Sequence, residues 1–446
     1  MNETICALAT APGVGAIAVI RVSGPDTFEK VSAIFKGKNL KDVPGNTVVF
    51  GTIRDGEKVV DEVLISVFKG PKSFTKEDTV EISTHGSDYI IRYVLKLLVK
   101  QGCRMAMPGE FTQRAFLNDK LDLAQAEAVA DLIDAGSVST AKAAAASLSG
   151  VFSKQVNALA DLVVHLRLLL EATLDFPEEE IEFLEKADAK GQLRNILQTH
   201  HDLLLAAQEG VKFRDGLQIV LVGEPNVGKS SLLNALAGEE IAIVSAIAGT
   251  TRDRIKQELN IRGIPLVLVD TAGLRDTADE VERIGIARTR KSVEEADLLL
   301  ILKDATQGLQ DALNNHLELP VHLPTITVLN KVDLLPEVPE LLNDVLPVSA
   351  KNGLGLEQLK DAILAKVGIA HTPDHGFMAR QRHVDALMVC GQHLAVAHEF
   401  AQQDDRILDL FAEELRLAHD ALGEITGRML PDDLLGLIFS RFCIGK

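Results

Sequence analysis

The chain has 446 residues, of which 46% are hydrophobic and 25% are charged. This length favours about three domains, and the apolar content is sufficient for packed cores. The formal net charge of −18 excludes a general basic coat for nucleic acid, although a local basic patch would still allow RNA as a partner. The four cysteines form no C-x-x-C pair and no zinc-type spacing, so we expect a reducing, cytoplasmic setting.

Neither a signal peptide nor a membrane span is expected. Gly13 and Gly15 break the first apolar run, which is unlike a secretory signal. The most apolar helical stretch, residues 156–174, contains the charged residues Asp161 and Glu171. A helix with those charges is a poor candidate for crossing a bilayer.

The pattern of apolar residues predicts four segments. Residues 1–118 mix strand-like and helix-like stretches and predict a small α/β domain. Helical spacing dominates residues 119–213 and returns in residues 373–446. The intervening residues 214–372 alternate apolar strands with glycine-rich turns. We therefore expect one helical domain with an α/β domain inserted into it, since chain termini often lie close together.

A phosphate-binding loop follows the first strand of the inserted segment. The run L-Q-I-V-L-V-G-E-P-N-V-G-K-S at 217–230 fits a strand followed by G-x-x-x-x-G-K-[ST]. Lys229 would reach the β- and γ-phosphates, and the Ser230 hydroxyl would bind Mg²⁺. The alternative is an ordinary glycine-rich turn before a surface helix. The loop residues predicted to contact nucleotide are Asn226, Val227, Gly228, Lys229, Ser230 and Ser231.

Three further motifs, each after an apolar strand, predict that the nucleotide is GTP rather than ATP. Asp270 would hold Mg²⁺ through water, and the Gly273 amide would face the γ-phosphate. The Asp333 carboxylate can accept hydrogen bonds from two guanine donors, an arrangement that adenine does not offer. The motifs are Asp270-Thr271-Ala272-Gly273, Asn330-Lys331-Val332-Asp333, and Ser349-Ala350-Lys351, which would pack the guanine O6 side.

The segment that should sense the γ-phosphate is Gly249–Asp253. Thr251 is the first choice for a second hydroxyl on Mg²⁺, and Thr250 is the alternative. Ras-like enzymes place a glutamine after D-T-A-G to orient the attacking water, but Leu274 stands there in this chain. Either hydrolysis is slow or another group takes that role. The charged candidates downstream are Arg275, Asp276, Asp279, Glu280, Glu282 and Arg283, with a carboxylate ranked first.

Long runs outside these motifs resemble the MnmE (TrmE) family of tRNA-modification GTPases. They include residues 108–111 (P-G-E-F), 114–128 (R-A-F-L-N-D-K-L-D-L-A-Q-A-E-A), 175–181 (D-F-P-E-E-E-I), 279–285 (D-E-V-E-R-I-G), 432–436 (D-D-L-L-G) and 442–446 (F-C-I-G-K). The resemblance implies a multidomain α/β plus α fold. Its parts are an N-terminal domain similar to tetrahydrofolate-binding domains, a discontinuous helical domain and an inserted Ras-like P-loop G domain.

The resemblance also implies an activity. The family acts as a homodimer with the flavoprotein MnmG (GidA). Together they add an aminomethyl or carboxymethylaminomethyl group to C5 of the tRNA wobble uridine. The one-carbon unit is implied to come from 5,10-methylene- or 5-formyl-tetrahydrofolate, and K⁺-dependent dimerisation of the G domains is implied to drive GTP hydrolysis.

The matching positions imply roles for individual residues. Glu282 orients the attacking water, and Cys443 takes part in the modification chemistry. The implied catalytic set is Glu282, Lys229, Gly273 and Cys443, the K⁺ ligands are Asn226, Ser245, Ile247 and Thr250, and the folate-binding residues are Arg21, Glu81, Lys120 and Lys446. The chain departs from the family at Ser245, where threonine is usual, and at Val14 and Ala16 in the first glycine-rich turn.

Two other interpretations remain open at this stage. One is a ribosome-assembly GTPase of the Era/EngA kind, which shares the leucine after D-T-A-G. This chain contains neither a second G domain nor a basic RNA-binding appendage. The other is a dimeric scaffold that binds folate and GTP without catalysis.

Overall fold

A computed structural model describes residues 3–175, 188–224, 226–237, 256–262, 264–270, 296–307, 323–338, 345–367, 376–402, 408–427, 432–440, 442 and 445. The chain divides into two compact units. The first comprises Met1–Ala130, Ser153–Ile196 and Val389–Lys446, and the second comprises Asp131–Phe152 and Leu197–Met388. Each unit has its own β-sheet, so the two are described separately.

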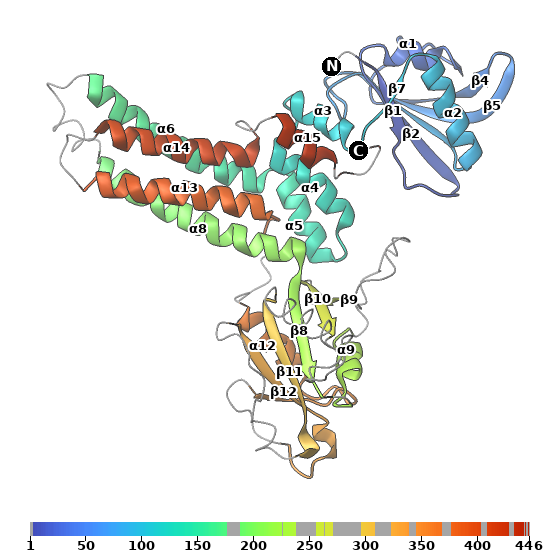
Figure 1. Cartoon of the computed structure of the whole chain (residues 1–446). Helices are drawn as coiled ribbons and strands as arrows, with labels where there is room; N and C mark the ends of the chain where they lie inside the picture. Colours follow the sequence, from blue (N-terminus) through green and yellow to red (C-terminus); the bar gives the residue numbers. More distant parts are fainter. Residues whose placement is uncertain are drawn as a thin grey trace, which may run out of the picture. The chain divides into compact units, whose positions relative to one another are not determined.

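The first unit is built on a seven-stranded sheet in the order β3-β4-β5-β6-β2-β1-β7 (Figure 1). Adjacent strands of this sheet are antiparallel except for β1 and β7, which are parallel. The strands are β1 (Ile5–Leu8), β2 (Ile17–Ser23), β3 (Phe35–Lys36), β4 (Thr47–Asp55), β5 (Lys58–Phe68), β6 (Thr79–His85) and β7 (Arg104–Met105). The helical and strand-like stretches expected for residues 1–118 are therefore both present.

One face of this sheet is buried and the other is exposed. Helices α1 (Thr27–Ser32) and α2 (Asp88–Lys100) contribute residues to the same apolar core as β2, β5 and β6. On the outward face, Val48, Phe50 and Leu64 are 61%, 65% and 48% exposed. This alternation is what period-2 patterning in an antiparallel sheet produces when helices cover a single face.

The remaining helices of the first unit bring distant segments together. They include α3 (Glu110–Leu117), α4 (Leu123–Asp134), α6 (Val151–Asp175), α14 (Leu408–Thr426) and α15 (Asp432–Ser440). Leu123 and Ala126 of α4 share an apolar cluster with Phe439 of α15 and with Phe442. The last described residues thus pack against helices that follow the N-terminal sheet.

The second unit contains the six-stranded sheet β13-β12-β11-β8-β10-β9, parallel except at β9. Its strands are β8 (Leu217–Gly223), β9 (Lys256–Ile261), β10 (Ile264–Asp270), β11 (Leu298–Asp304), β12 (Thr325–Asn330) and β13 (Val345–Pro347), with helices α9 (Lys229–Ala237) and α12 (Leu356–Lys366). The strand order reverses at β8, so a ligand is expected beyond the carboxyl end of that strand.

Both ends of the segment that carries the six-stranded sheet are anchored at one place in the second unit. Helix α5 (Val138–Leu148) lies in this unit, while α4, α6, α8 (Ala189–Asp215) and α13 (Gln381–Phe400) contribute residues to both units. Asp131 accepts hydrogen bonds from Arg214 at 3.0 Å and from Arg380 at 2.8 Å. The chain thus enters and leaves the six-stranded sheet beside a single carboxylate.

Among the helices that the structure describes, none combines the length and the apolar character needed to cross a membrane.

Candidate functional site

The glycine loop lies between β8 and α9, as the motif predicted. Asn226 has φ of 65° and Gly228 has φ of 97°, so the loop turns through left-handed conformations. A Cβ at Gly228 would lie 2.3 Å from Asn330 Nδ2, which leaves no room for any other residue. Lys229 Nζ donates to the carbonyls of Gly223 at 2.7 Å and Glu224 at 3.2 Å, so its ammonium lies over the loop.

Asn330 joins three of the predicted motifs. Its side chain is buried, donates to the Val227 carbonyl at 2.8 Å and accepts from the Ala350 amide at 3.1 Å. The next residue, Lys331, has φ of 68° and donates to the Asn226 carbonyl at 2.8 Å. The sequence motifs at 226–231, 330–333 and 349–351 therefore converge at the carboxyl ends of β8 and β12.

Asp333 is positioned by a neighbouring motif. The Ser349 hydroxyl donates to Asp333 Oδ1 at 2.6 Å, and Ser349 itself is fully buried. Oδ2 of Asp333 accepts no hydrogen bond from any residue the structure describes. An ionised carboxylate held in this way can accept from a ligand that presents adjacent N–H donors, as guanine does.

The sequence analysis missed Asp304, which ends β11. Lys331 Nζ contacts Asp304 Oδ2 at 2.6 Å, and the Thr306 amide and hydroxyl donate to Oδ1 at 3.0 and 2.6 Å. Burial opposes ionisation of Asp304, but the hydrogen bonds from Lys331 and Thr306 outweigh it and hold the pKa of the carboxyl below its usual value. The available signal was an aspartate at the end of a parallel strand beside two other functional strand ends.

The other predicted nucleotide residues divide into three groups. Ser230 and Ser231 are exposed in the first turn of α9, and Lys351 is exposed in the turn after β13. The backbone of Asp270 ends β10, whereas its side chain lies outside the described part. Also outside the described residues are Ser245, Ile247, Thr250, Thr251, Thr271, Ala272, Gly273, Leu274 and Glu282.

The first unit contains a separate cavity of about 420 Å³. Two of the predicted folate residues, Glu81 and Lys120, line it together with Phe74. Arg21 donates to Glu81 Oε1 at 2.9 Å from both Nε and Nη2, and its guanidinium lies 4.9 Å from the Phe74 ring centroid. Three residues predicted from distant positions are therefore neighbours.

Lys120 is held at the edge of this cavity. Its Nζ donates to the Ser73 carbonyl at 2.7 Å and lies 5.3 Å from the centroid of Phe74. Burial lowers the pKa of Lys120, and the positive charges of Arg21 and Lys76 lower it further. Phe74 was not anticipated from the sequence, because a lone aromatic in a polar loop gives no pattern.

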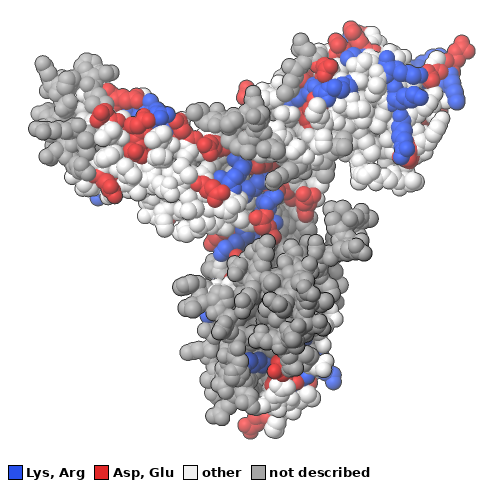
Figure 2. Space-filling model, viewed as in Figure 1, with Lys and Arg blue, Asp and Glu red and all other residues white. Residues whose placement is uncertain are grey.

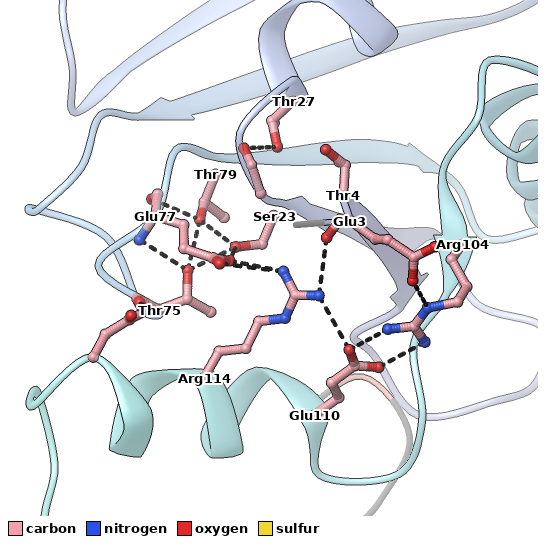
Figure 3. Close-up of polar contacts among 12 residues, drawn as sticks. Glu3, Thr4, Ser23, Thr27, Thr75, Glu77, Thr79, Arg104, Glu110 and Arg114 are labelled. Atoms are coloured by element: carbon pink, nitrogen blue, oxygen red, sulfur yellow. Dashed lines mark hydrogen bonds and ion pairs between the residues drawn. The ribbon is translucent and has the colours of Figure 1, made fainter. Parts of the chain in front are cut away.

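A buried ionic network supports the cavity (Figure 3). Arg114, with a side chain 2% exposed, donates to Glu77 Oε2 at 3.1 Å, to Glu110 Oε1 at 3.1 Å and to the Glu3 carbonyl at 2.9 Å. Arg104 completes the network with bonds of 2.5 and 3.0 Å to Glu110. The network ties α3 to the segment before β6, which carries the cavity residue Phe74.

Residues near the end of the sequence reach the same unit. Gly445 has φ of 96°, and a Cβ there would lie 1.9 Å from the Leu8 carbonyl oxygen. Leu8 pairs with Ile20, one position from the pairing of Ala7 with Arg21. Gly445 therefore packs against the end of β1, next to the strand that carries Arg21. Cys443 and Lys446 lie outside the described residues.

Comparison with known proteins decides the family. Residues 4–120 match the family model described as "GTP-binding protein TrmE N-terminus", and residues 123–443 match "MnmE helical domain". A protein of Bordetella petrii named "tRNA modification GTPase MnmE" is 53% identical over 99% of this chain and 98% of its own length. The chain belongs to the MnmE (TrmE) family. An MnmE of Chromobacterium violaceum is 50% identical over 99% of this chain and 98% of its own length.

Two solved structures of GTP-binding domains match parts of this MnmE-family chain. Era of Aquifex aeolicus, crystallised with GDP and AlF₄⁻, is 30% identical over 40% of this chain and 66% of its own, with a TM-score of 0.28. The FeoB G domain of Methanococcus jannaschii is 30% identical over 34% of this chain and 97% of its own, with a TM-score of 0.24. The family assignment depends on the full-length relatives, not on these partial matches.

Replacing Asn330 with alanine tests the convergence of the motifs. Asn330→Ala would leave the Val227 carbonyl and the Ala350 amide without their partner. Guanine nucleotide affinity should fall by about tenfold to a hundredfold, in line with about 1–3 kcal/mol for unsatisfied buried groups. The measurement is titration with a fluorescent GDP. Asn352→Ala, at an exposed position, is the control and should bind normally. Equal affinity of both folded variants would contradict the assigned role.

The ionic network predicts a pH-dependent effect on stability. Burial opposes ionisation of Glu110, but the hydrogen bonds from Arg104, the Met107 amide and Arg114 hold the pKa of its carboxyl below the usual value of about 4.5. A lowered folded-state pKa stabilises the native state above about pH 4.5 and loses that contribution as the pH falls through the folded value.

Glu110→Gln should therefore reduce the free energy of unfolding at pH 7 by about 1–3 kcal/mol. The difference from the unmodified chain should shrink as the pH falls below 4.5. Urea denaturation across this pH range measures it. Glu57→Gln, in the exposed β4–β5 turn, is the control and should change little at any pH. A Glu110→Gln deficit of the same size at pH 7 and at pH 3 would refute the electrostatic account.

Proposed function

We propose that this protein is a GTPase that modifies tRNA at the wobble uridine. The observation that carries the proposal is the convergence on Asn330 of the phosphate loop, the N-K-x-D motif and the S-A-K motif. Relatives named tRNA modification GTPase MnmE are about half identical over almost the whole chain, for example 53% over 99%. Together these observations favour GTP as the nucleotide and tRNA as the macromolecular substrate.

The chain's own residues account for nucleotide binding and for positioning the attacking water. Lys229 would contact the β- and γ-phosphates, and Asp333 would select guanine. Because Leu274 has no group able to orient water, Glu282 would hold the nucleophile by accepting one of its hydrogens. Gly273 would donate its amide to the γ-phosphate.

Two cations fit the donors around the loop. Mg²⁺ would be held by Ser230, exposed in the first turn of α9, and by Thr251. The carbonyl of Asn226 is already occupied by Lys331, so its side-chain oxygen is the donor for K⁺, with Ser245, Ile247 and Thr250. The ions would neutralise charge that builds up between the phosphates during hydrolysis. The loop that supplies the other K⁺ ligands would become ordered when two G domains meet.

The cavity of the first unit suits a reduced folate. Its volume of about 420 Å³ lies in the range of small-molecule pockets. Both contacting nitrogens of Arg21 bond to Glu81 Oε1, which leaves Oε2 to accept from the pterin N–H groups. Lys120 supplies a cation for the glutamate tail, and Phe74 offers an aromatic face. The ligand would be 5,10-methylene- or 5-formyl-tetrahydrofolate, with Lys446 as a further contact.

Cys443 would work beside this folate. Gly445, two residues later, packs on the end of β1, next to the strand that carries Arg21. That placement supports a shared site for the folate residues and the F-C-I-G-K motif. The product would be an aminomethyl or carboxymethylaminomethyl group on C5 of the uridine, made with the flavoprotein MnmG (GidA).

The domain organisation belongs to the same proposal. Residues 1–118 would form the folate-binding-like domain, and 214–372 would be a G domain inserted between helical segments 119–213 and 373–446. Asp131 supports the insertion, because it binds Arg214 before the G domain and Arg380 after it. The exposed apolar residues Val48, Phe50 and Leu64 support homodimerisation through the first domain.

Deletion of the gene tests the function directly. Wobble nucleosides of the deletion strain, analysed by mass spectrometry, should lack the C5 substituent, and the intact gene should restore it. Glu282→Ala should fail to restore it and should hydrolyse GTP at least ~100-fold more slowly, the smaller end of what a general catalytic group contributes. Unchanged nucleosides in the deletion strain would favour a ribosome-assembly GTPase. Hydrolysis equally slow in K⁺ and in Na⁺ would favour a non-catalytic scaffold.

The folate site has its own test. Glu81→Gln and Lys120→Met should each weaken binding of 5-formyl-tetrahydrofolate by about tenfold or more, since each removes a charge-assisted hydrogen bond worth about 1.5–3 kcal/mol. Calorimetric titration measures this, and GDP affinity should stay constant. Glu62→Gln, an exposed position on β5, is the matched control. Normal folate binding by both pocket variants would remove this cavity as the folate site.

A further inference from the structure

Helix α2 has two different faces. Ile91, Val94, Leu97 and Leu98 are buried in the core of the first unit's sheet. The opposite side carries Tyr89, Arg92, Lys96 and Lys100, and half-buried Tyr93 lies at its edge; these five residues are called the α2 outer face. Figure 2 shows basic side chains gathered over this helix. Packing against the sheet explains the buried side of α2 and leaves the composition of the outer face unexplained.

The charge of this face contrasts with that of the whole chain. The protein carries a formal net charge of −18, yet three cations follow one another at positions 92, 96 and 100. Positions four apart lie on one side of a helix, about 6 Å apart along its axis, so these cations form a line about 12 Å long. Such a line matches a polyanion better than it matches a single small anion.

Acidic neighbours neutralise little of this line. Arg92 pairs with Asp88 at 2.8 Å, but their side chains are 78% and 63% exposed, and an exposed pair is easily exchanged for another anion. Lys96 and Lys100 form no ion pair with any residue in the described part of the chain. Asp55, at the end of β4, accepts a hydrogen bond from the Tyr93 hydroxyl at 2.8 Å.

Aromatic side chains accompany the cations. The whole sequence contains two tyrosines and no tryptophan, and both tyrosines lie on this face. The rings of Tyr89 and Tyr93 stack with centroids 5.8 Å apart and an interplanar angle of 13°. The hydrogen bond to Asp55 holds the Tyr93 side chain in place, and the Tyr89 ring stacks against it. Tyr89 is 68% exposed, so its outer ring surface is available for contact.

We propose that the α2 outer face binds the tRNA, with Arg92, Lys96 and Lys100 on successive phosphates and the Tyr89 ring under an unpaired base. The proposal rests on the proposed tRNA-modifying function and adds a contact surface to it. Cations that follow a backbone, next to an exposed aromatic platform, are the combination that binds unpaired nucleic acid. The wobble uridine lies in a single-stranded loop, where bases are free to stack on aromatic side chains.

Salt dependence separates this proposal from a general loss of binding. The probe is an unmodified tRNA transcript with uridine at the wobble position, titrated against the full chain at several salt concentrations. Each phosphate contact contributes about 0.7–0.9 to the slope of log affinity against log salt. The triple variant Arg92→Gln, Lys96→Gln, Lys100→Gln should therefore lower that slope by about 2–3. The control carries Lys36→Gln, Lys38→Gln and Lys154→Gln, an equal charge change at exposed positions elsewhere.

The aromatic contact has a separate signature. Tyr89→Ala should weaken binding by about fivefold to a hundredfold without changing the salt slope, because base stacking contributes about 1–3 kcal/mol. The effect should vanish with a control RNA whose anticodon loop is closed into a duplex. GTP hydrolysis, folate binding and molecular mass in solution should stay the same in every variant.

Four outcomes would overturn the proposal. An unchanged salt slope in the triple variant would show that these cations do not contact the backbone. A changed molecular mass would assign the face to contacts between copies of this chain. If the variants bound tRNA normally but no longer bound the flavoprotein, the α2 outer face would be a surface for a protein partner. Failure of the unaltered chain to bind tRNA would contradict the proposed function itself, which separates that failure from failure of the α2 surface alone.

Discussion

The nucleotide site depends on one buried amide. Asn330 satisfies a carbonyl of the phosphate loop and an amide of the S-A-K motif with a single side chain. A buried amide of this kind stabilises the site only while all of its partners are present, because an unpaired group costs about 1–3 kcal/mol. Residue 228 must be glycine because the side-chain nitrogen of Asn330 occupies the space that a Cβ would need. The conformation of the glycine loop and the position of the S-A-K motif are therefore set by the same side chain.

In the first unit, a buried ion-pair network around Arg114 joins separate segments in the same way. Arg114 is almost completely buried, and its guanidinium bonds to two carboxylates and a main-chain carbonyl. Removing one partner from such a network leaves a charge in an apolar setting, which is far more costly than losing an exposed ion pair. The network joins α3 to the segment that bears Phe74, so the shape of the cavity depends on residues that do not line it. Substitutions at Arg114 should disturb the cavity as well as stability.

The sequence predicted the parts of these sites that depend on local pattern. The phosphate loop was recognisable because strand, glycine loop and helix are consecutive, and the guanine motifs because each follows a strand. Asp304 and Phe74 were missed because their roles come from neighbours distant in the sequence, Lys331 and Arg21. The role of Asp131 was hidden for the same reason, since an aspartate in a helix is usually a solvated residue. The family resemblance predicted that Arg21, Glu81 and Lys120 belong to one site, whereas their spacing in the sequence did not.

Close packing at glycines shows why the first unit requires residues from both ends of the sequence. Gly109 has φ of 69°, and a Cβ there would lie 2.4 Å from the Phe439 carbonyl, while Gly445 is in similar contact with Leu8. Backbone atoms at that distance cannot move aside as a flexible side chain can. Helix α15 and Gly445 are thus seated on the start of α3 and the end of β1 by shape, and Phe439 and Phe442 are buried with Leu123 and Ala126. Phe442 and Gly445 consequently pack in the same structural unit as Arg21, Glu81 and Lys120.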